Sequence, residues 1–154
     1  MDKLIAALGH QFARLHADSV QLVQTVSVAE LFRRPAGTDS AALSCGEQLL
    51  RSAGIVEQTF GGITVNLWDD PFEWTQPESL TSRDKVLEYL NEVESTRRSG
   101  FQLFKSDDDL MKDVMSPTGA TRLLPLLLDT LVRAAHHLGR AQATAELLKQ
   151  RPKL

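Results

Sequence analysis

Two adjacent histidines near the end of the chain, His136 and His137, are the side chains in this sequence best suited to chemistry. They lie in the stretch Ala-His-His-Leu-Gly-Arg, inside a long apolar segment that is typical of a helix. Imidazole nitrogens bind zinc and other transition metals, and they titrate near neutral pH. The pair therefore suggests a metal site, for which neighbouring elements must supply further ligands.

Length and composition limit the class of protein. The chain has 154 residues, of which 42% are hydrophobic and 24% charged, and this predicts one globular domain over residues 1–154. Its net charge of -3 comes without a basic stripe, which argues against a nucleic-acid partner. No stretch approaches the roughly 20 apolar residues of a membrane span, and the first residues do not resemble a signal peptide. We therefore expect a cytoplasmic protein without a membrane partner, in which the single cysteine, Cys45, is buried.

The spacing of apolar residues predicts an all-α fold. Apolar residues recur at intervals of three and four over four segments, at about 4–26, 45–68, 82–104 and 121–150. The segment Ser27–Glu30 matches a capping box for a short turn, and Ser44–Glu47 matches a second capping box, which opens a helix. Ser106 and the acidic residues after it predict a short extra helix, and no stretch shows the alternation of a β-strand. We expect an antiparallel four-helix bundle with a short extra helix between the third and fourth long helices.

The last long helix has one apolar side and one charged side. The apolar side, which we expect to be buried, consists of Leu123, Leu127, Thr130, Ala134, Leu138, Ala141, Ala145 and Leu148. The other side carries Asp129, Arg133, His136 and Arg140, so His136 is predicted to face solvent. His137 falls at the edge of the buried side, where it is either a core-edge histidine with one hydrogen bond or a metal ligand.

The third long helix carries two charges on its apolar face. Glu94 and Arg97 share that face with Val86, Leu90 and Val93. Because an unpaired buried charge is costly, we expect Glu94 and Arg97 to pair with each other or with groups on a neighbouring helix.

Three short motifs follow one another along the chain. They are Glu-Leu-Phe-Arg-Arg-Pro at 30–35, Ser-Cys-Gly-Glu-Gln-Leu-Leu at 44–50, and the Ala-His-His helix near the C-terminus. In this order they resemble the DinB/YfiT-like superfamily of metalloenzymes, over nearly the whole chain. The resemblance implies a four-helix bundle, often dimeric, in which one histidine on helix two and a His-x-x-x-His pair on helix four hold zinc or nickel. It also implies activities such as thiol-dependent transfer and isomerisation.

Carried over from the resemblance, the three metal positions fall on Arg51, Arg133 and His137. Arginine stays protonated and has no lone pair to offer a cation, so two of the three positions are not ligands. We therefore expect no metal, with His137 the only retained candidate ligand. Zinc or nickel would bind only at an altered site, for example with His10 or His16 turned inward beside a carboxylate.

In place of the metal site, we expect a polar pocket formed by Arg51, Arg133 and His137 together with Glu94 and Arg97. Guanidinium groups at such a position suit an anion or a carboxylate partner. No residue of this set is assigned a catalytic role.

Three classes of function remain open. The first is a binding or interaction protein, or one that acts on an anionic small molecule. The second is a DinB-like thiol transferase or hydrolase, either with an altered metal site or with an arginine-lined pocket for an anionic substrate or a low-molecular-weight thiol. The third is a structural dimerisation module. A homodimer is the expected assembly.

Overall fold

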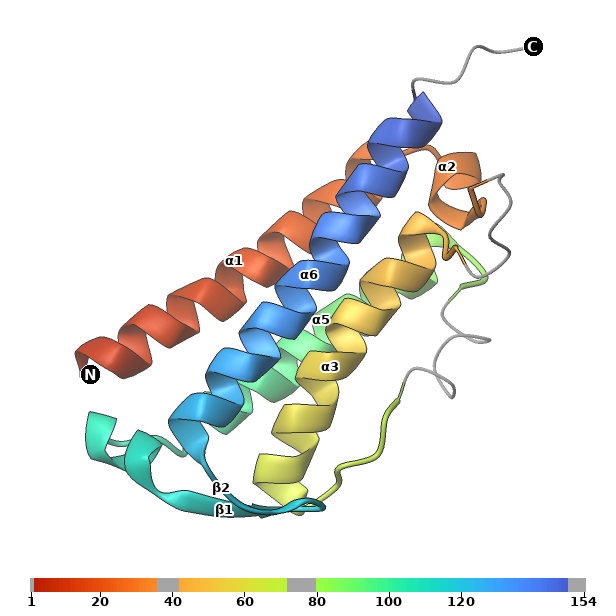
Figure 1. Cartoon of the computed structure of the whole chain (residues 1–154). Helices are drawn as coiled ribbons and strands as arrows, with labels where there is room; N and C mark the ends of the chain where they lie inside the picture. The colour runs from red at the N-terminus through yellow and green to blue at the C-terminus, as the bar shows by residue number, and fades with distance from the viewer. Residues whose placement is uncertain (1, 36–41, 72–79, 150–154) are drawn as a thin grey trace.

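Four long helices lie side by side in the computed structural model, which describes residues 2–35, 42–71 and 80–149 (Figure 1). They are α1 (Lys3–Thr25), α3 (Cys45–Val65), α5 (Arg83–Phe101) and α6 (Leu123–Lys149). Two short segments complete the helical part, namely the α-helix α2 (Val28–Phe32) and the 3-10 helix η1 (Asp107–Met111). The predicted all-helical bundle is confirmed, and η1 is the short extra helix between the third and fourth long helices.

The long helices run in two directions (Figure 1). α1 and α6 run one way, and α3 and α5 run the other way. The carboxylate of Asp107, just after α5, accepts hydrogen bonds from the backbone N–H groups of Leu4 and Ile5 at the start of α1, at 3.1 and 3.0 Å. The antiparallel neighbours are thus α3 with α6 and α1 with α5, whereas α3 and α5 are parallel neighbours. The α3–α6 pair has the most extensive contact, so side chains on its shared face are the most firmly positioned.

Both predicted capping boxes are present. Ser44 Oγ accepts from the backbone N–H of Glu47, and the Glu47 carboxylate accepts from the backbone N–H of Ser44, each at 3.1 Å. Ser27 and Glu30 form the equivalent box at the start of α2. Glu47 also accepts two hydrogen bonds from the Arg34 guanidinium, at 2.8 and 2.7 Å. This charged contact ties the segment after α2 to the first turn of α3.

The buried side of α6 agrees with the prediction. All eight residues assigned to it are buried: Leu123, Leu127, Thr130, Ala134, Leu138, Ala141, Ala145 and Leu148. The residues predicted to face solvent are exposed, namely Asp129, Arg133, His136 and Arg140. The exposure of His137 is intermediate between buried and exposed. The helical period therefore places the polar residues of α6 correctly before any neighbour is known.

Aromatic rings fill the core where α1, α3 and α5 meet. The rings of Phe12, Phe60 and Phe101 lie with their centroids 5.3 to 5.7 Å apart. Gly100 gives Phe60 room, because a Cβ atom at Gly100 would lie 2.6 Å from the ring. These aromatic rings form part of the buried core.

Among the described helices, none is both long and apolar enough to cross a membrane.

A β-hairpin between η1 and α6 departs from the all-helical expectation. β1 (Asp113–Ser116) pairs antiparallel with β2 (Gly119–Arg122), with Ser116 opposite Gly119. Gly119 has a φ of 115°, a conformation that favours glycine. The expectation that no strand forms was therefore wrong at these residues, because four-residue strands give too few alternations to reveal a period of two.

Candidate basic site between α3 and α6

The structure divides the five predicted pocket residues between two places. Arg51 on α3 and Arg133 on α6 each lie close enough to His137 on α6 to act on its pKa. Glu94 and Arg97 on α5 are buried, bonded to each other, and act instead on His16 of α1. The expected single pocket is thus two polar groups, because the charged side chains of α5 are directed toward α1.

The first group is a cluster of basic side chains around His137. We call it the basic cluster, and it consists of Arg51, Arg133, His136, His137 and Arg140. His137 is half-buried, and its Nδ1 lies 2.8 Å from Oε1 of the buried Gln48 on α3. Because an amide oxygen only accepts hydrogen bonds, Nδ1 carries the proton and the neutral ring keeps its lone pair on Nε2.

Burial, as the largest cause, and the basic side chains of Arg51, His136, Arg140 and Arg133 together lower the pKa of His137 to about 4. Each of these four side chains is basic. His137 is therefore neutral at pH 7 and lies in a region of positive potential. A neutral imidazole beside several guanidinium groups is suited to contact with an anion.

Solvent reaches the basic cluster. The Arg133 side chain is 53% exposed, and its Nη1 lies 3.6 Å from Oδ2 of Asp129, one turn earlier on α6. A surface ion pair of this kind contributes little and is easily exchanged for another partner. Arg140 and His136 are also exposed, so an incoming ligand can approach along the outer surface of α6.

Gln48 is the member of this site that sequence reasoning missed. The resemblance places the helix-two position on Arg51, one turn further along α3, whereas Gln48 makes the direct contact with His137. A signal exists in the sequence, because Gln48 is a polar residue among buried positions of α3 and needs a partner there.

Three polar contacts across the α3–α6 interface hold the two sides of the site in place. Gln48 meets His137, as described, and Ser52 Oγ donates to the backbone carbonyl of Ala134 at 2.8 Å. Further along, the hydroxyl groups of Thr59 and Thr130 lie 2.6 Å apart. All of these contacts would break if α3 slid along α6, so they fix the distance between the arginines that the two helices carry.

The second group is the ion pair of Glu94 and Arg97, each less than 10% exposed. The Glu94 carboxylate accepts from Nε of Arg97 at 3.2 Å and from its Nη2, and also from Nε of Arg98 at 3.2 Å. The Arg97 guanidinium lies 5.1 Å from the centroid of the Phe101 ring. The expectation that these two charges pair with each other is confirmed.

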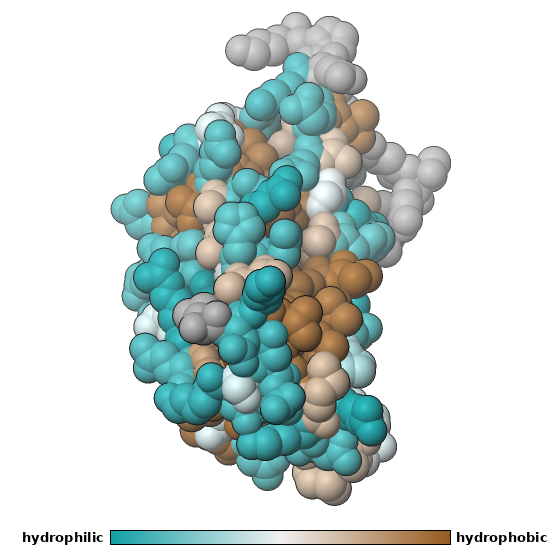
Figure 2. Space-filling view, turned by 90° about the vertical axis from the view of Figure 1, so that its left-hand side faces the viewer, coloured by the Kyte–Doolittle hydropathy of each residue, from teal (hydrophilic) through white to brown (hydrophobic). Residues whose placement is uncertain are grey.

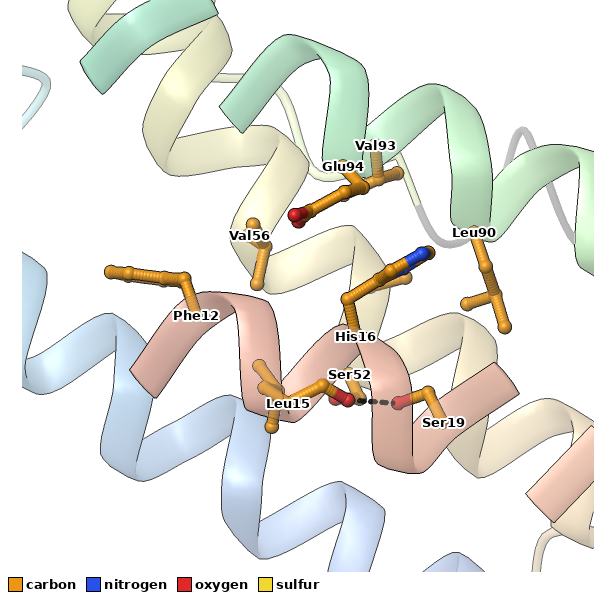
Figure 3. A pocket seen from close by; sticks show the side chains of 10 residues that line it. Phe12, Leu15, His16, Ser19, Ser52, Val56, Leu90, Val93 and Glu94 are labelled. Atoms are coloured by element: carbon orange, nitrogen blue, oxygen red, sulfur yellow. Dashed lines mark hydrogen bonds between the residues drawn. The ribbon is translucent and has the colours of Figure 1, made fainter. Parts of the chain in front are cut away.

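A small cavity of about 30 Å³ lies between α1, α3 and α5, next to this ion pair (Figure 3). Its polar lining consists of His16, Ser19, Ser52 and Glu94, and Ser19 Oγ donates to the carbonyl of Leu15 at 2.8 Å. Burial lowers the pKa of His16, although the negative charge of Glu94 opposes the shift. A cavity of this size has room for about one water molecule, so it is not a substrate pocket.

The residues present do not fit the metal site that the resemblance implies. Arg51 and Arg133 have no lone pair for a cation. His16 is turned inward beside a carboxylate, as an altered site would require, but that carboxylate already binds Arg97 and Arg98, while His10 is exposed. Among the residues that the structure describes, no three His, Cys, Asp or Glu side chains are grouped so as to hold a metal ion.

Comparison with known proteins supports the class of fold and goes no further. No protein-family model and no curated protein sequence matches the chain. The structure is similar to the crystal structure of a conserved protein of a locus from Enterococcus faecalis, with a TM-score of 0.74. The match covers 97% of this chain and 99% of that chain at 14% sequence identity. At this identity the similarity shows a shared helical-bundle fold alone.

Proposed function

We propose that this chain is a helical-bundle binding protein that takes a small oxyanion, such as a phosphate or a carboxylate, at the basic cluster. One observation carries the proposal: the side chains that act on the half-buried His137 are all basic, namely Arg51, Arg133, His136 and Arg140. The positive charge of three guanidinium groups near one imidazole favours a bound oxyanion, which can accept hydrogen bonds from them.

The same residues argue against the three-histidine metal chemistry of the DinB/YfiT-like family. Arg51 and Arg133 occupy positions that the resemblance assigns to ligands, and a guanidinium repels a cation. In this proposal the two arginine side chains supply the positive charge that a metal ion would supply at these positions, and they bind an anion directly. The anion is either a small metabolite or the acidic part of a low-molecular-weight thiol.

Thermal unfolding in the presence of inorganic phosphate tests the proposal. A ligand at about 100 times its dissociation constant adds about 2.7 kcal/mol to the free energy of unfolding. We expect phosphate to raise the Tm of the wild-type chain at constant ionic strength, and we expect Arg51→Ala and Arg133→Ala each to remove most of that increase.

Arg122→Ala is the matched control, because Arg122 is 66% exposed and lies on the β-hairpin, outside the basic cluster. It should leave the response to phosphate unchanged. If the Arg51 and Arg133 variants respond to phosphate as fully as the wild type does, the basic cluster is not the anion site.

A DinB-like transferase or hydrolase with an altered metal site is the second candidate, favoured by the inward placement of His16 beside Glu94. Elemental analysis of protein purified without a tag tests it. We expect zinc and nickel far below one ion per chain. Near-stoichiometric metal that is lost in His16→Gln but kept in His10→Gln would establish this candidate in place of the anion-binding protein.

A homodimer is the third expectation, and the exposed apolar residues Leu128 and Val132 on α6 favour it. Sedimentation at micromolar concentration tests the assembly. A monomer at that concentration would exclude a structural dimerisation module as the function, while leaving anion binding by single chains untouched.

A further inference from the structure

We infer that the basic cluster takes an oxyanion that carries its own hydroxyl group, such as hydrogen phosphate or a hydroxy-carboxylate, and discriminates against a fully ionised oxyanion such as sulfate. The inference rests on the anion-binding function proposed above and names the class of ligand. Its basis is the hydrogen bond between His137 and Gln48, which leaves one acceptor in a site otherwise built of donors.

The buried side of the site fixes the tautomer of His137. Gln48 is 2% exposed, and its Oε1 lies 2.8 Å from Nδ1 of the imidazole. The hydrogen bond that one ring nitrogen makes determines the role of the other. Because Nδ1 donates to the amide oxygen, Nε2 of the neutral ring has a lone pair and no hydrogen. Gln48 is therefore a positioning residue, which decides that the ligand meets an acceptor.

Nε2 of His137 is open to a ligand. Among the residues that the structure describes, the buried side-chain atom without a hydrogen-bond partner is Nε of Arg83 on α5. Nε2 of His137 has no partner in that part of the chain either, so it is not buried and solvent reaches it. The two ring nitrogens point in different directions, so a ligand at Nε2 does not displace Gln48.

The guanidinium groups lie one helical turn from this contact. On α6, Arg133 precedes His137 by four residues and Arg140 follows it by three, which makes both of them its neighbours on the helix surface. On α3, Arg51 follows Gln48 by three residues. An oxyanion held by these donors therefore brings one of its oxygen atoms to Nε2.

The hydrogen on that oxygen decides the affinity. A hydroxyl donates to Nε2, whereas an ionised oxygen sets its lone pairs against the lone pair of the ring. Sulfate can meet the imidazole only when the ring is protonated, which burial and the basic neighbours oppose, since the pKa of His137 is about 4. Phosphate keeps an O–H group at neutral pH and can meet either form of the ring. A site that hydrogen-bonds a ligand hydroxyl rejects the analogue that lacks it.

Isothermal titration calorimetry with two matched pairs of anions tests the inference. The pairs are inorganic phosphate with sulfate and glycolate with acetate, at neutral pH and constant ionic strength. We expect the anion with the hydroxyl group to bind at least about tenfold more tightly than its counterpart. A preference within the first pair alone identifies a phosphate ligand, and one within the second pair alone identifies a hydroxy-carboxylate.

Gln48→Met tests the cause of the preference. Methionine is close to glutamine in size but has no amide oxygen, so the ring of His137 is free to present N–H at Nε2. We expect the preference for phosphate over sulfate to fall to about twofold or less, while the arginines keep both anions bound. Gln58→Met is the matched control on α3, because Gln58 bonds to the backbone carbonyl of Trp68 and not to His137. It should keep the wild-type preference.

Comparison of the two variants also removes general effects of the anions. Hydrophilic residues cover most of the face of the molecule in Figure 2, so every anion also acts on charges away from the site. Sulfate and phosphate both stabilise folded proteins without binding. These effects are the same in Gln48→Met and Gln58→Met, so a difference between the two chains reports on the site.

NMR of the ¹⁵N-labelled imidazole rings checks the tautomer in the wild-type chain, and it does not depend on a variant that folds. We expect His137 to carry its proton on Nδ1 at neutral pH, and we expect added phosphate to shift the Nε2 resonance more than that of Nδ1. A proton on Nε2 in the absence of an anion would overturn the inference.

The outcomes separate the class of ligand from the site. Equal affinity within both pairs would overturn this inference and leave anion binding at the basic cluster standing. A preference that survives Gln48→Met would overturn the role of Gln48. No binding of any of the four anions would overturn the proposed function as well.

Discussion

The two polar groups of this bundle each contain a histidine with a lowered pKa, but their surroundings differ. His16 lies beside Glu94, whose negative charge opposes the lowering, and that carboxylate is itself paired with Arg97. His137 lies among side chains that all lower its pKa further. The charged groups beside His16 include a carboxylate, whereas the side chains that lower the pKa of His137 are basic. This difference in charge around the two histidines is why the anion site is proposed at His137 and not at His16.

The largest expected effect comes from breaking the ion pair of Glu94 and Arg97. Glu94→Leu leaves the buried Arg97 without its carboxylate, and we expect the free energy of unfolding to fall by about 3–5 kcal/mol. Urea denaturation measures the change. The double variant Glu94→Leu, Arg97→Met removes both charges and should recover most of the loss. A single variant as stable as the wild type would show that water hydrates the Arg97 guanidinium and that the ion pair does not stabilise the fold.

The pH dependence of stability tests the second group. The pKa of His137 is about 4 in the folded chain and near 6.5 when unfolded. Between these values the imidazole of His137 binds a proton in the unfolded chain but not in the folded chain. The contribution of His137 to the free energy of unfolding therefore falls as the pH decreases from about 6.5 to 4, and this contribution is constant above that range. We expect His137 to contribute about 1–2 kcal/mol of this fall, because solvent screens part of the effect at a half-buried ring.

Urea denaturation at pH 7 and pH 4.5 measures this contribution. The difference in stability between the two pH values should be smaller in His137→Gln than in the wild type. Burial also lowers the pKa of His16, which adds a fall in the same direction and remains in the variant. Equal differences in both chains would mean that the pKa of His137 is not lowered by folding.

Phosphate should distinguish the two histidines. An anion bound at the basic cluster favours the protonated imidazole, so we expect saturating phosphate to raise the pKa of His137 by about one unit, equivalent to about 1.4 kcal/mol. The pKa of His16 should not change, because Glu94 and Arg97 already neutralise each other. NMR titration of the ring protons checks both values in one sample. Equal shifts in both histidines would indicate general screening by salt in place of a bound anion.

The smallest expected effect is that of Arg98→Ala. Arg98 also binds Glu94, but its side chain is 70% exposed. We expect the free energy of unfolding to change by less than about 1 kcal/mol in urea denaturation, since a solvated guanidinium contributes little to an ion pair. A loss as large as that of Glu94→Leu would assign the role of partner to Arg98 in place of Arg97.

The sequence predicts the helices well because their patterns are long. The buried side of α6 repeats over 27 residues, so the period identifies every buried residue on it. The capping boxes at Ser27 and Ser44 are local patterns and need no tertiary information. The same approach does not predict the hairpin at 113–122, because two four-residue strands contain too few alternations of apolar and polar residues.

The candidate site is predicted only in part, because its members depend on how the helices face one another. Periodicity places Arg133 on the exposed side of α6 and His137 at the edge of the buried side, and the structure agrees. It does not reveal that Gln48 reaches His137, nor that Glu94 turns toward α1. Which helix lies beside which, and at what height, is tertiary information that spacing along one helix does not contain.

The polar contacts between α3 and α6 have a consequence for hydrogen exchange. Gln48, Ser52 and Thr59 each bond across to α6, so these two helices should separate only when the whole chain unfolds. The contact of α1 with α6 is less extensive than that of α3 with α6, and a small cavity lies at the inner face of α1. Backbone amides of α1 should therefore exchange through local opening, faster than those of α3 and α6. The arginines of the basic cluster would keep their spacing during such an opening, so anion binding would persist while the first helix fluctuates.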